Sequence, residues 1–122
     1  TTGTVQTGIY GDKANAMGLP MFVPDDVHQE RVMAAIYGPQ GAKAGYTNGI
    51  CREDLISAAE YLVKTHGCNC LILGCTELPL ILDESDDFEV AGSRVIVVDP
   101  TAALARKVVK TAEDAYAATG IR

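Results

Sequence analysis

The chain has 122 residues, 48% hydrophobic and 21% charged, which is the length and composition of one folded domain. Its formal net charge of -6 argues against a nucleic-acid surface, because such a surface needs clustered lysines and arginines. No apolar run is long enough to cross a bilayer and no basic, apolar leader opens the sequence, so we expect no membrane partner. A small molecule or another protein is the expected partner.

The cysteines are too few and too clustered for a secreted disulfide framework, and a reducing, cytoplasmic location is expected. They are Cys51, Cys68, Cys70 and Cys75. A zinc site built from His66 and these cysteines is disfavoured, because the paired Cys-x-x-Cys spacing is missing and alternate residues of a strand rarely converge on a metal. We therefore expect no metal.

The first third of the chain predicts short elements and then a loop. Residues 1–5 predict a turn or a helix entry, residues 9–17 a short helix ended by Gly18, and residues 19–23 a short strand. Residues 24–26 supply the cap of a second helix that runs through Tyr37. Residues 38–48 are glycine-rich and without periodicity, which predicts a binding loop whose only cation is Lys43.

The rest of the chain alternates strands with helices. Residues 52–66 have helical periodicity up to Gly67, residues 70–73 and 95–98 are apolar strands, and the acidic run 83–87 predicts a solvated loop. Asp99 as N-cap and Pro100 at the first position begin a last helix with an apolar stripe, which Gly120 ends. This alternation predicts an α/β fold, a parallel sheet with helices on both faces. Three strands are few for such a sheet.

Cys75 is the main candidate for chemistry. It follows a buried strand that ends at Gly74, and ligands bind outside the carboxyl ends of strands in open α/β sheets. A second apolar segment with Pro79 in its first turn predicts that Cys75 stands at a helix N-terminus, which would favour the thiolate. Cys75 is thus a candidate nucleophile or general base. The alternative is that it is a small buried hydrophobic residue.

Four short motifs, in this order and spacing across nearly the whole chain, resemble the cofactor-independent aspartate/glutamate racemase family. They are Thr1-Thr2-Gly3-Thr4, Gly41-Ala42-Lys43-Ala44-Gly45, Gly74-Cys75-Thr76-Glu77 and Asp99-Pro100-Thr101. The third is fairly specific to the aspartate-type members. The resemblance covers only the second half of a family member.

The resemblance implies a two-lobe fold with the active site between the lobes. Residues 1–98 then correspond to the second lobe, without its first strand, and residues 99–122 to a C-terminal helix that packs on an absent first lobe. The family's first-lobe Cys-Asn-Thr element does not occur here. An exposed helix stripe and an unpaired sheet edge would favour association, so a homo-oligomer is expected.

The resemblance also implies a reaction and its residues. Two cysteines exchange protons at Cα of an acidic amino acid without pyridoxal phosphate or any other cofactor, and Cys75 is the second of them. Thr4 and Thr76 match substrate-binding threonines, and Lys43 matches a lysine that meets the side-chain carboxylate. Glu77 is a possible supporting residue.

Each of these residues has a structural alternative. Thr76 is a candidate helix cap, Thr4 a turn hydroxyl, and Lys43 and Glu77 are candidates for solvated charges. Other functions also stay open: a one-cysteine decarboxylase or dicarboxylate isomerase of the wider superfamily, or a non-catalytic carboxylate-binding module. On the two-cysteine account this chain alone is inactive.

Overall fold

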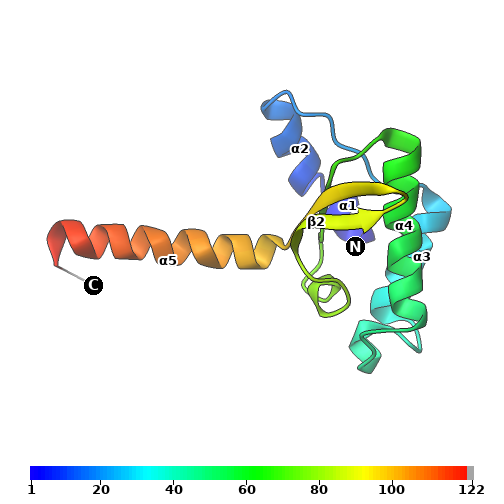
Figure 1. Cartoon of the computed structure of the whole chain (residues 1–122). Coiled ribbons are helices and arrows are strands. Elements are labelled where there is room, and N and C mark those ends of the chain that lie inside the picture. The colour runs from blue at the N-terminus through cyan, green and yellow to red at the C-terminus, as the bar shows by residue number, and fades with distance from the viewer. Residues whose placement is uncertain (121–122) are drawn as a thin grey trace.

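The computed structural model describes residues 1–120 as a three-stranded sheet flanked by helices, with a long last helix that projects away from them (Figure 1). The elements, in chain order, are α1 Thr2–Thr7, α2 Ile9–Ala16, α3 Asp26–Tyr37, the 3-10 turn η1 Ala42–Ala44, α4 Ile50–His66, β1 Cys70–Ile72, the 3-10 turn η2 Leu78–Leu80, β2 Ser85–Val90, β3 Ser93–Val98 and α5 Pro100–Thr119.

The helices begin and end where their capping residues predict. The Asp25 carboxylate accepts the His28 N–H at 2.9 Å at the start of α3, and Asp99 accepts the Thr101 N–H at 3.0 Å at the start of α5. Gly67 and Gly120 are left-handed at the ends of α4 and α5, both with φ of 66°. The helices predicted from residues 9, 24–26, 52 and 99 onward are therefore confirmed.

The sheet is mixed, so the prediction of a parallel sheet is wrong in part. Its order is β1-β3-β2, with β1 parallel and β2 antiparallel to β3. β2 and β3 form a hairpin whose turn residues, Ala91 and Gly92, both have positive φ, 51° and 73°. The acidic run is consequently not all loop: β2 begins at Ser85, and Asp86 and Asp87 point to solvent from an edge strand.

The strand predicted over residues 19–23 does not form. This segment is coil, and its one backbone hydrogen bond runs from the Leu19 N–H to Ala14 O at the end of α2. Pro20 and Pro24 lack the N–H that a strand interior needs, which explains why the strand predicted from the apolar pattern is wrong. Within residues 1–120, β1 is therefore an edge strand on this side.

The described helices cover one face of the sheet, and the prediction of helices on both faces is wrong for residues 1–120. Leu71, Val95 and Val97 are buried toward α3 and α4, in one core that includes Ile36 and Leu55. Their neighbours in the strands point the other way: the side chains of Ile72 and Ile96 are 42% and 45% exposed. The apolar side chains of β1 and β3 thus pack into a core on one face of the sheet, and those on the other face stay exposed.

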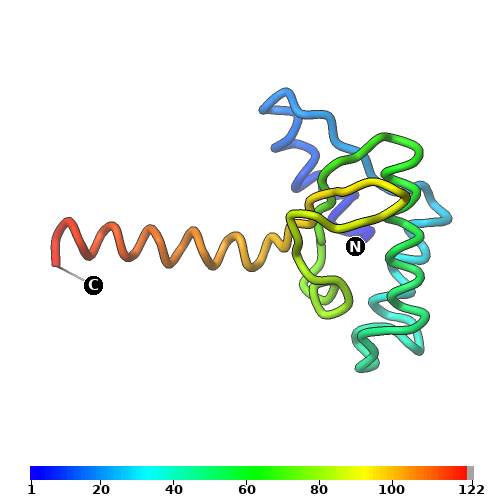
Figure 2. The backbone as a smooth tube through the Cα atoms, in the orientation of Figure 1, coloured from blue at the N-terminus to red at the C-terminus, as the bar shows by residue number. Residues whose placement is uncertain are grey.

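Helix α5 projects away from the other elements (Figures 1 and 2), and none of its described residues is buried. Leu104 is 64% exposed and Val108 58%, on the apolar stripe that the sequence predicts. The last two residues of the predicted closing segment, 121–122, lie outside the described residues. None of the described helices combines the length and the apolarity that a membrane span requires.

Candidate functional site

A small pocket of about 290 Å³ lies at the carboxyl end of β1. After β1 the Leu73 N–H still bonds Val98 O of β3 at 3.0 Å, and the chain then leaves the sheet through Gly74. The pocket is lined by Thr1, Thr4, Tyr10, Leu73, Gly74, Cys75, Thr76, Pro100 and Thr101. Three of the five predicted site residues, Thr4, Cys75 and Thr76, therefore face one space.

Cys75 is half-buried, and its thiol donates a hydrogen bond to Glu77 Oε2 at 2.8 Å. The segment after it is not an α-helix but the short turn η2, so the expected helix dipole is absent. Burial and then the hydrogen bond to Glu77 raise the pKa of the Cys75 thiol. The prediction of an easily formed thiolate is wrong for this state: Cys75 is a neutral thiol at neutral pH.

Glu77 lies at the centre of the polar contacts. Its Oε2 accepts hydrogen bonds from Cys75 and, at 3.0 Å, from the Thr76 hydroxyl, while its Oε1 lies 3.0 Å from Lys43 Nζ. These three donors, Cys75 first, lower the pKa of Glu77 to about 2. Glu77 is therefore ionised at every physiological pH and carries the only negative charge in this cluster.

Lys43 reaches the site from the glycine-rich loop. A Cβ at Gly41 would come within 2.8 to 2.9 Å of the carbonyl oxygens of Ala34, Ala35 and Ile36, so only glycine lets the loop lie this close to the end of α3. Lys43 is 48% exposed, its Nζ lies 5.5 Å from the centre of the Tyr37 ring, and the bond to Glu77 raises its pKa. Lys43 does not line the small pocket; it is joined to Cys75 through Glu77.

The two threonines have firm contacts. The Thr4 hydroxyl donates to Gly74 O at 3.2 Å and lies 3.0 Å from the Thr1 hydroxyl, which ties α1 to the end of β1. The Thr76 hydroxyl donates to Glu77 and caps no helix, so that structural alternative is wrong. Both threonines line the same pocket as Cys75.

Tyr10 and Thr101 also line the pocket, although neither is among the predicted site residues. Tyr10 lies in α2, whose weak periodicity gave no sign of which face turns toward β1. Thr101 follows Asp99-Pro100, a motif already explained by helix capping. Only the position of β3 beside β1 brings the start of α5 to this pocket.

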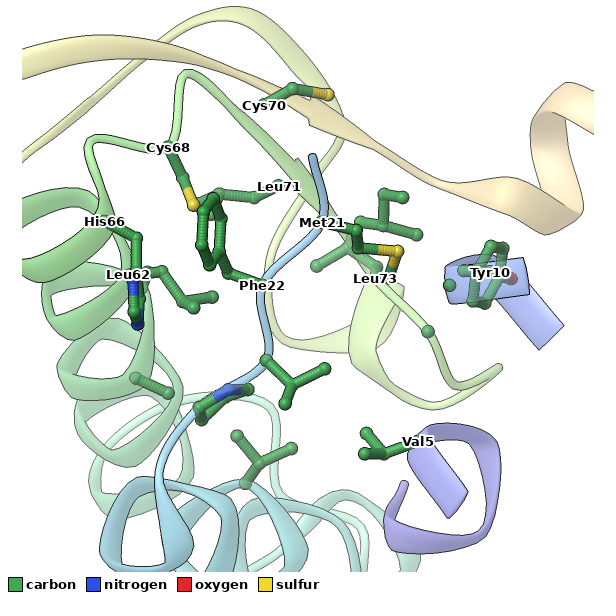
Figure 3. A pocket seen from close by; sticks show the side chains of 18 of the residues that line it. Val5, Tyr10, Met21, Phe22, Leu62, His66, Cys68, Cys70, Leu71 and Leu73 are labelled. Carbon is green, nitrogen blue, oxygen red and sulfur yellow. The ribbon is translucent and has the colours of Figure 1, made fainter. Parts of the chain in front are cut away.

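A larger cavity of about 700 Å³ adjoins the small pocket and borders β1 (Figure 3). Side chains of Phe22, Leu62, Leu71 and Leu73 line it, and among its described lining residues His66 is the one whose side chain has a titratable nitrogen. His66 stacks on Phe22, with ring centroids 4.4 Å apart. This apolar lining does not suit a charged substrate, so we place the candidate chemistry in the small pocket.

Comparison with known proteins gives two findings. A family model described as Asp/Glu/Hydantoin racemase matches residues 1–108, which include every residue of the site. An uncharacterized protein of Pectobacterium carotovorum subsp. carotovorum, described by its place in the pnlA 3′ region, is 37% identical over 110 residues. That alignment covers 90% of this chain and 67% of the relative.

Proposed function

Because the chain belongs to the Asp/Glu/hydantoin racemase family, we propose that it takes part in the racemisation of aspartate or glutamate without pyridoxal phosphate or another cofactor. The observation that carries this proposal is the meeting of Cys75, Thr4 and Thr76 in one pocket at the end of β1. An acid/base group and two hydroxyl donors are what proton exchange beside a carboxylate requires.

Racemisation needs two acid/base groups on opposite faces of Cα. One removes the Cα proton, the electron pair stays on carbon as a carbanion or enediolate, and the other gives a proton to the opposite face. Cys75 is one of these groups. Of the four cysteines it alone lines the small pocket, so the second thiol belongs to another polypeptide segment, the first lobe of the family fold.

In this proposal the hydroxyls of Thr4 and Thr76 turn from Gly74 O and Glu77 when substrate binds and donate to its α-carboxylate instead. Removal of the Cα proton adds charge beside that carboxylate, and hydrogen bonds that strengthen as the charge grows lower the barrier. Without a pyridoxal ring to take up the charge, hydrogen-bond donors in a site that excludes water have to stabilise it.

Lys43 favours an acidic amino acid over a hydantoin, although the family description includes both. Its ammonium binds one carboxylate, that of Glu77, and the Lys43 side chain as a whole is 48% exposed. A side-chain carboxylate of aspartate or glutamate supplies a second anionic partner, whereas a hydantoin ring brings none.

The bare surfaces of the chain support a partner lobe or an oligomer. Ile72 and Ile96 on the open face of the sheet and Leu104 and Val108 on α5 are all more than 40% exposed. Apolar area of this kind is usually covered in the working protein. We propose that the first lobe covers part of it and supplies the second cysteine.

A one-cysteine reaction is the second candidate, and the neutral state of Cys75 favours it. A decarboxylase or a dicarboxylate isomerase needs only a proton donor at this place, and Cys75 has its proton. A carboxylate-binding module without catalysis would use the same hydroxyls and Lys43.

Product analysis separates these functions. The chain is incubated in D₂O with L-aspartate, L-glutamate, maleate, an aryl malonate and a hydantoin, alone and with a family first lobe, and followed by NMR and chiral chromatography. We expect deuterium at Cα and the D-amino acid only in the mixture, and loss of both with Cys75→Ser. Cys70→Ser, whose sulfur lies outside the small pocket, is the matched control. Racemisation by the isolated chain would disprove the two-cysteine account.

A further inference from the structure

The carboxylate of Glu77 contacts both the Cys75 thiol and the Lys43 ammonium, two groups that the proposed reaction needs. Its two oxygens are used differently: Oε2 accepts from Cys75 at 2.8 Å and from Thr76 at 3.0 Å, and Oε1 binds Lys43 at 3.0 Å. The Glu77 side chain is 22% exposed, so water competes little for these contacts. Lys43, Glu77 and Cys75 thus form one continuous chain of charge-assisted contacts.

With Glu77 ionised beside the Lys43 ammonium, the contact between Cys75 and Glu77 requires the proton to be on the sulfur. An ionised carboxylate accepts a hydrogen bond and cannot donate one, so its partner sulfur must carry the proton. A thiolate at the same place would lie against a negative charge.

The other charged groups nearby act more weakly on the sulfur. Lys43 binds the oxygen of Glu77 that does not face Cys75, and Tyr37 lies beneath Lys43.

We propose that Glu77 is a positioning residue that keeps Cys75 protonated, so that Cys75 enters the reaction as the proton donor, and that Lys43 anchors Glu77 in this role. The inference rests on the proposed racemase function and adds which of the two cysteines donates the proton. The segment that supplies the second thiol then begins the reaction as the thiolate.

The proton transfer balances in this direction. The second thiolate takes the Cα proton, the electron pair left on carbon takes the proton of Cys75, and a new Cα–H bond forms on the opposite face as the Cys75 S–H bond breaks. Cys75 is left as a thiolate beside Glu77. The charge of Glu77 makes that thiolate a strong base, so it readily takes a proton from the other enantiomer in the reverse direction.

The test measures thiol ionisation and needs no racemase activity. The whole chain is alkylated with iodoacetamide from pH 6 to 10, and peptide mass spectrometry gives the rate at each cysteine. Glu77→Gln keeps the shape and removes the charge. Glu84→Gln is the matched control, because Glu84 is also ion-paired, to Arg106 at 2.8 Å, but belongs to another cluster.

We expect Glu77→Gln to lower the midpoint of Cys75 alkylation by about one pH unit, so that the rate at pH 8 rises about tenfold. Glu84→Gln leaves the midpoint unchanged. Cys51, which is 1% exposed, reports on folding: it must stay unreactive in all variants. An unchanged Cys75 midpoint in Glu77→Gln, with Cys51 still protected, overturns the inference.

Added aspartate distinguishes this inference from the function on which it rests. If aspartate or glutamate slows alkylation of Cys75 in the wild type but Glu77→Gln does not shift the midpoint, the substrate proposal stands and the role of Glu77 is refuted. If Glu77→Gln shifts the midpoint but neither amino acid protects Cys75 even with the first lobe present, Glu77 controls the thiol and the substrate proposal fails.

Discussion

Helices α3 and α4 differ from helices α1, α2 and α5 in how much of them is buried. α3 and α4 bury seven residues between them, including Ile36 and Cys51, whereas no residue of α1, α2 or α5 is buried. All five have helical geometry and most have good caps. The difference shows that caps and local propensity determine where a helix forms, but burial requires a surface on which its apolar side can pack.

The candidate site lies on the border between these two regions. Cys75 and Lys43 come from the packed region, while Thr4 comes from α1 and is held by its bond to Gly74 O. The geometry of the pocket therefore depends on a part of the chain with little burial of its own. A partner that covers α1 or α5 would also make the pocket more rigid.

Truncation in the packed region should have the largest effect on stability. Ile36 is fully buried, so Ile36→Ala is expected to lower the free energy of unfolding by about 2–5 kcal/mol, measured by urea titration. The matched change on α5, Leu104→Ala, should alter it by less than about 0.5 kcal/mol. A large effect of Leu104→Ala would show that α5 is packed in solution.

A methyl group at Gly41 should have the next largest effect. Gly41→Ala places Cβ within 3 Å of three carbonyl oxygens at the end of α3, so we expect a loss of about 1–3 kcal/mol and displacement of Lys43 from Glu77. Gly11→Ala in α2 is the control. It meets nothing within 4 Å and should stabilise its helix by up to about 1 kcal/mol. Equal effects of both changes would contradict the difference in packing between the end of α3 and α2.

Removing the link between α1 and β1 should have a smaller effect. Thr4→Val loses the hydrogen bond to Gly74 O and is expected to cost about 0.5–1.5 kcal/mol. Faster hydrogen exchange of the α1 amides would show that α1 is held less firmly. Thr7→Val serves for comparison, because the Thr7 hydroxyl bonds only carbonyls of its own helix. If α1 exchanges equally fast in both variants, the Thr4 contact does not hold it.

Titration of two carboxylates should show the smallest effects. Glu77, with a pKa of about 2 against an ordinary 4.5, adds stability above about pH 4.5 that is lost as the pH falls toward 2. Carboxyl NMR should show that Lys43→Met raises the pKa of Glu77 alone. Arg106→Met should raise only that of Glu84, whose pKa Arg106 lowers from α5. No rise at Glu84 would mean that the start of α5 is detached in solution.

The sequence named several residues that line the candidate pocket, because residues of one short motif stay close together in the fold. Cys75 and Thr76 are neighbours in the chain, and the resemblance to a known family connected them with Thr4 and Lys43. It gave no site role to Tyr10, nor to Thr101 in its last motif, and both reach the pocket only through the packing of α2 and the pairing of β3. Nor did it predict the neutral thiol, since that depends on where Glu77 points.

What the sequence determined by itself is local: the ends of α3, α4 and α5, and β3, because caps, glycines and apolar runs act within a few residues. The tertiary structure alone decided the antiparallel β2, the bare face of the sheet and the protonation of Cys75. Strand pairing, burial and the pKa of a thiol depend on groups far apart in the chain, and no local pattern specifies which of them will meet.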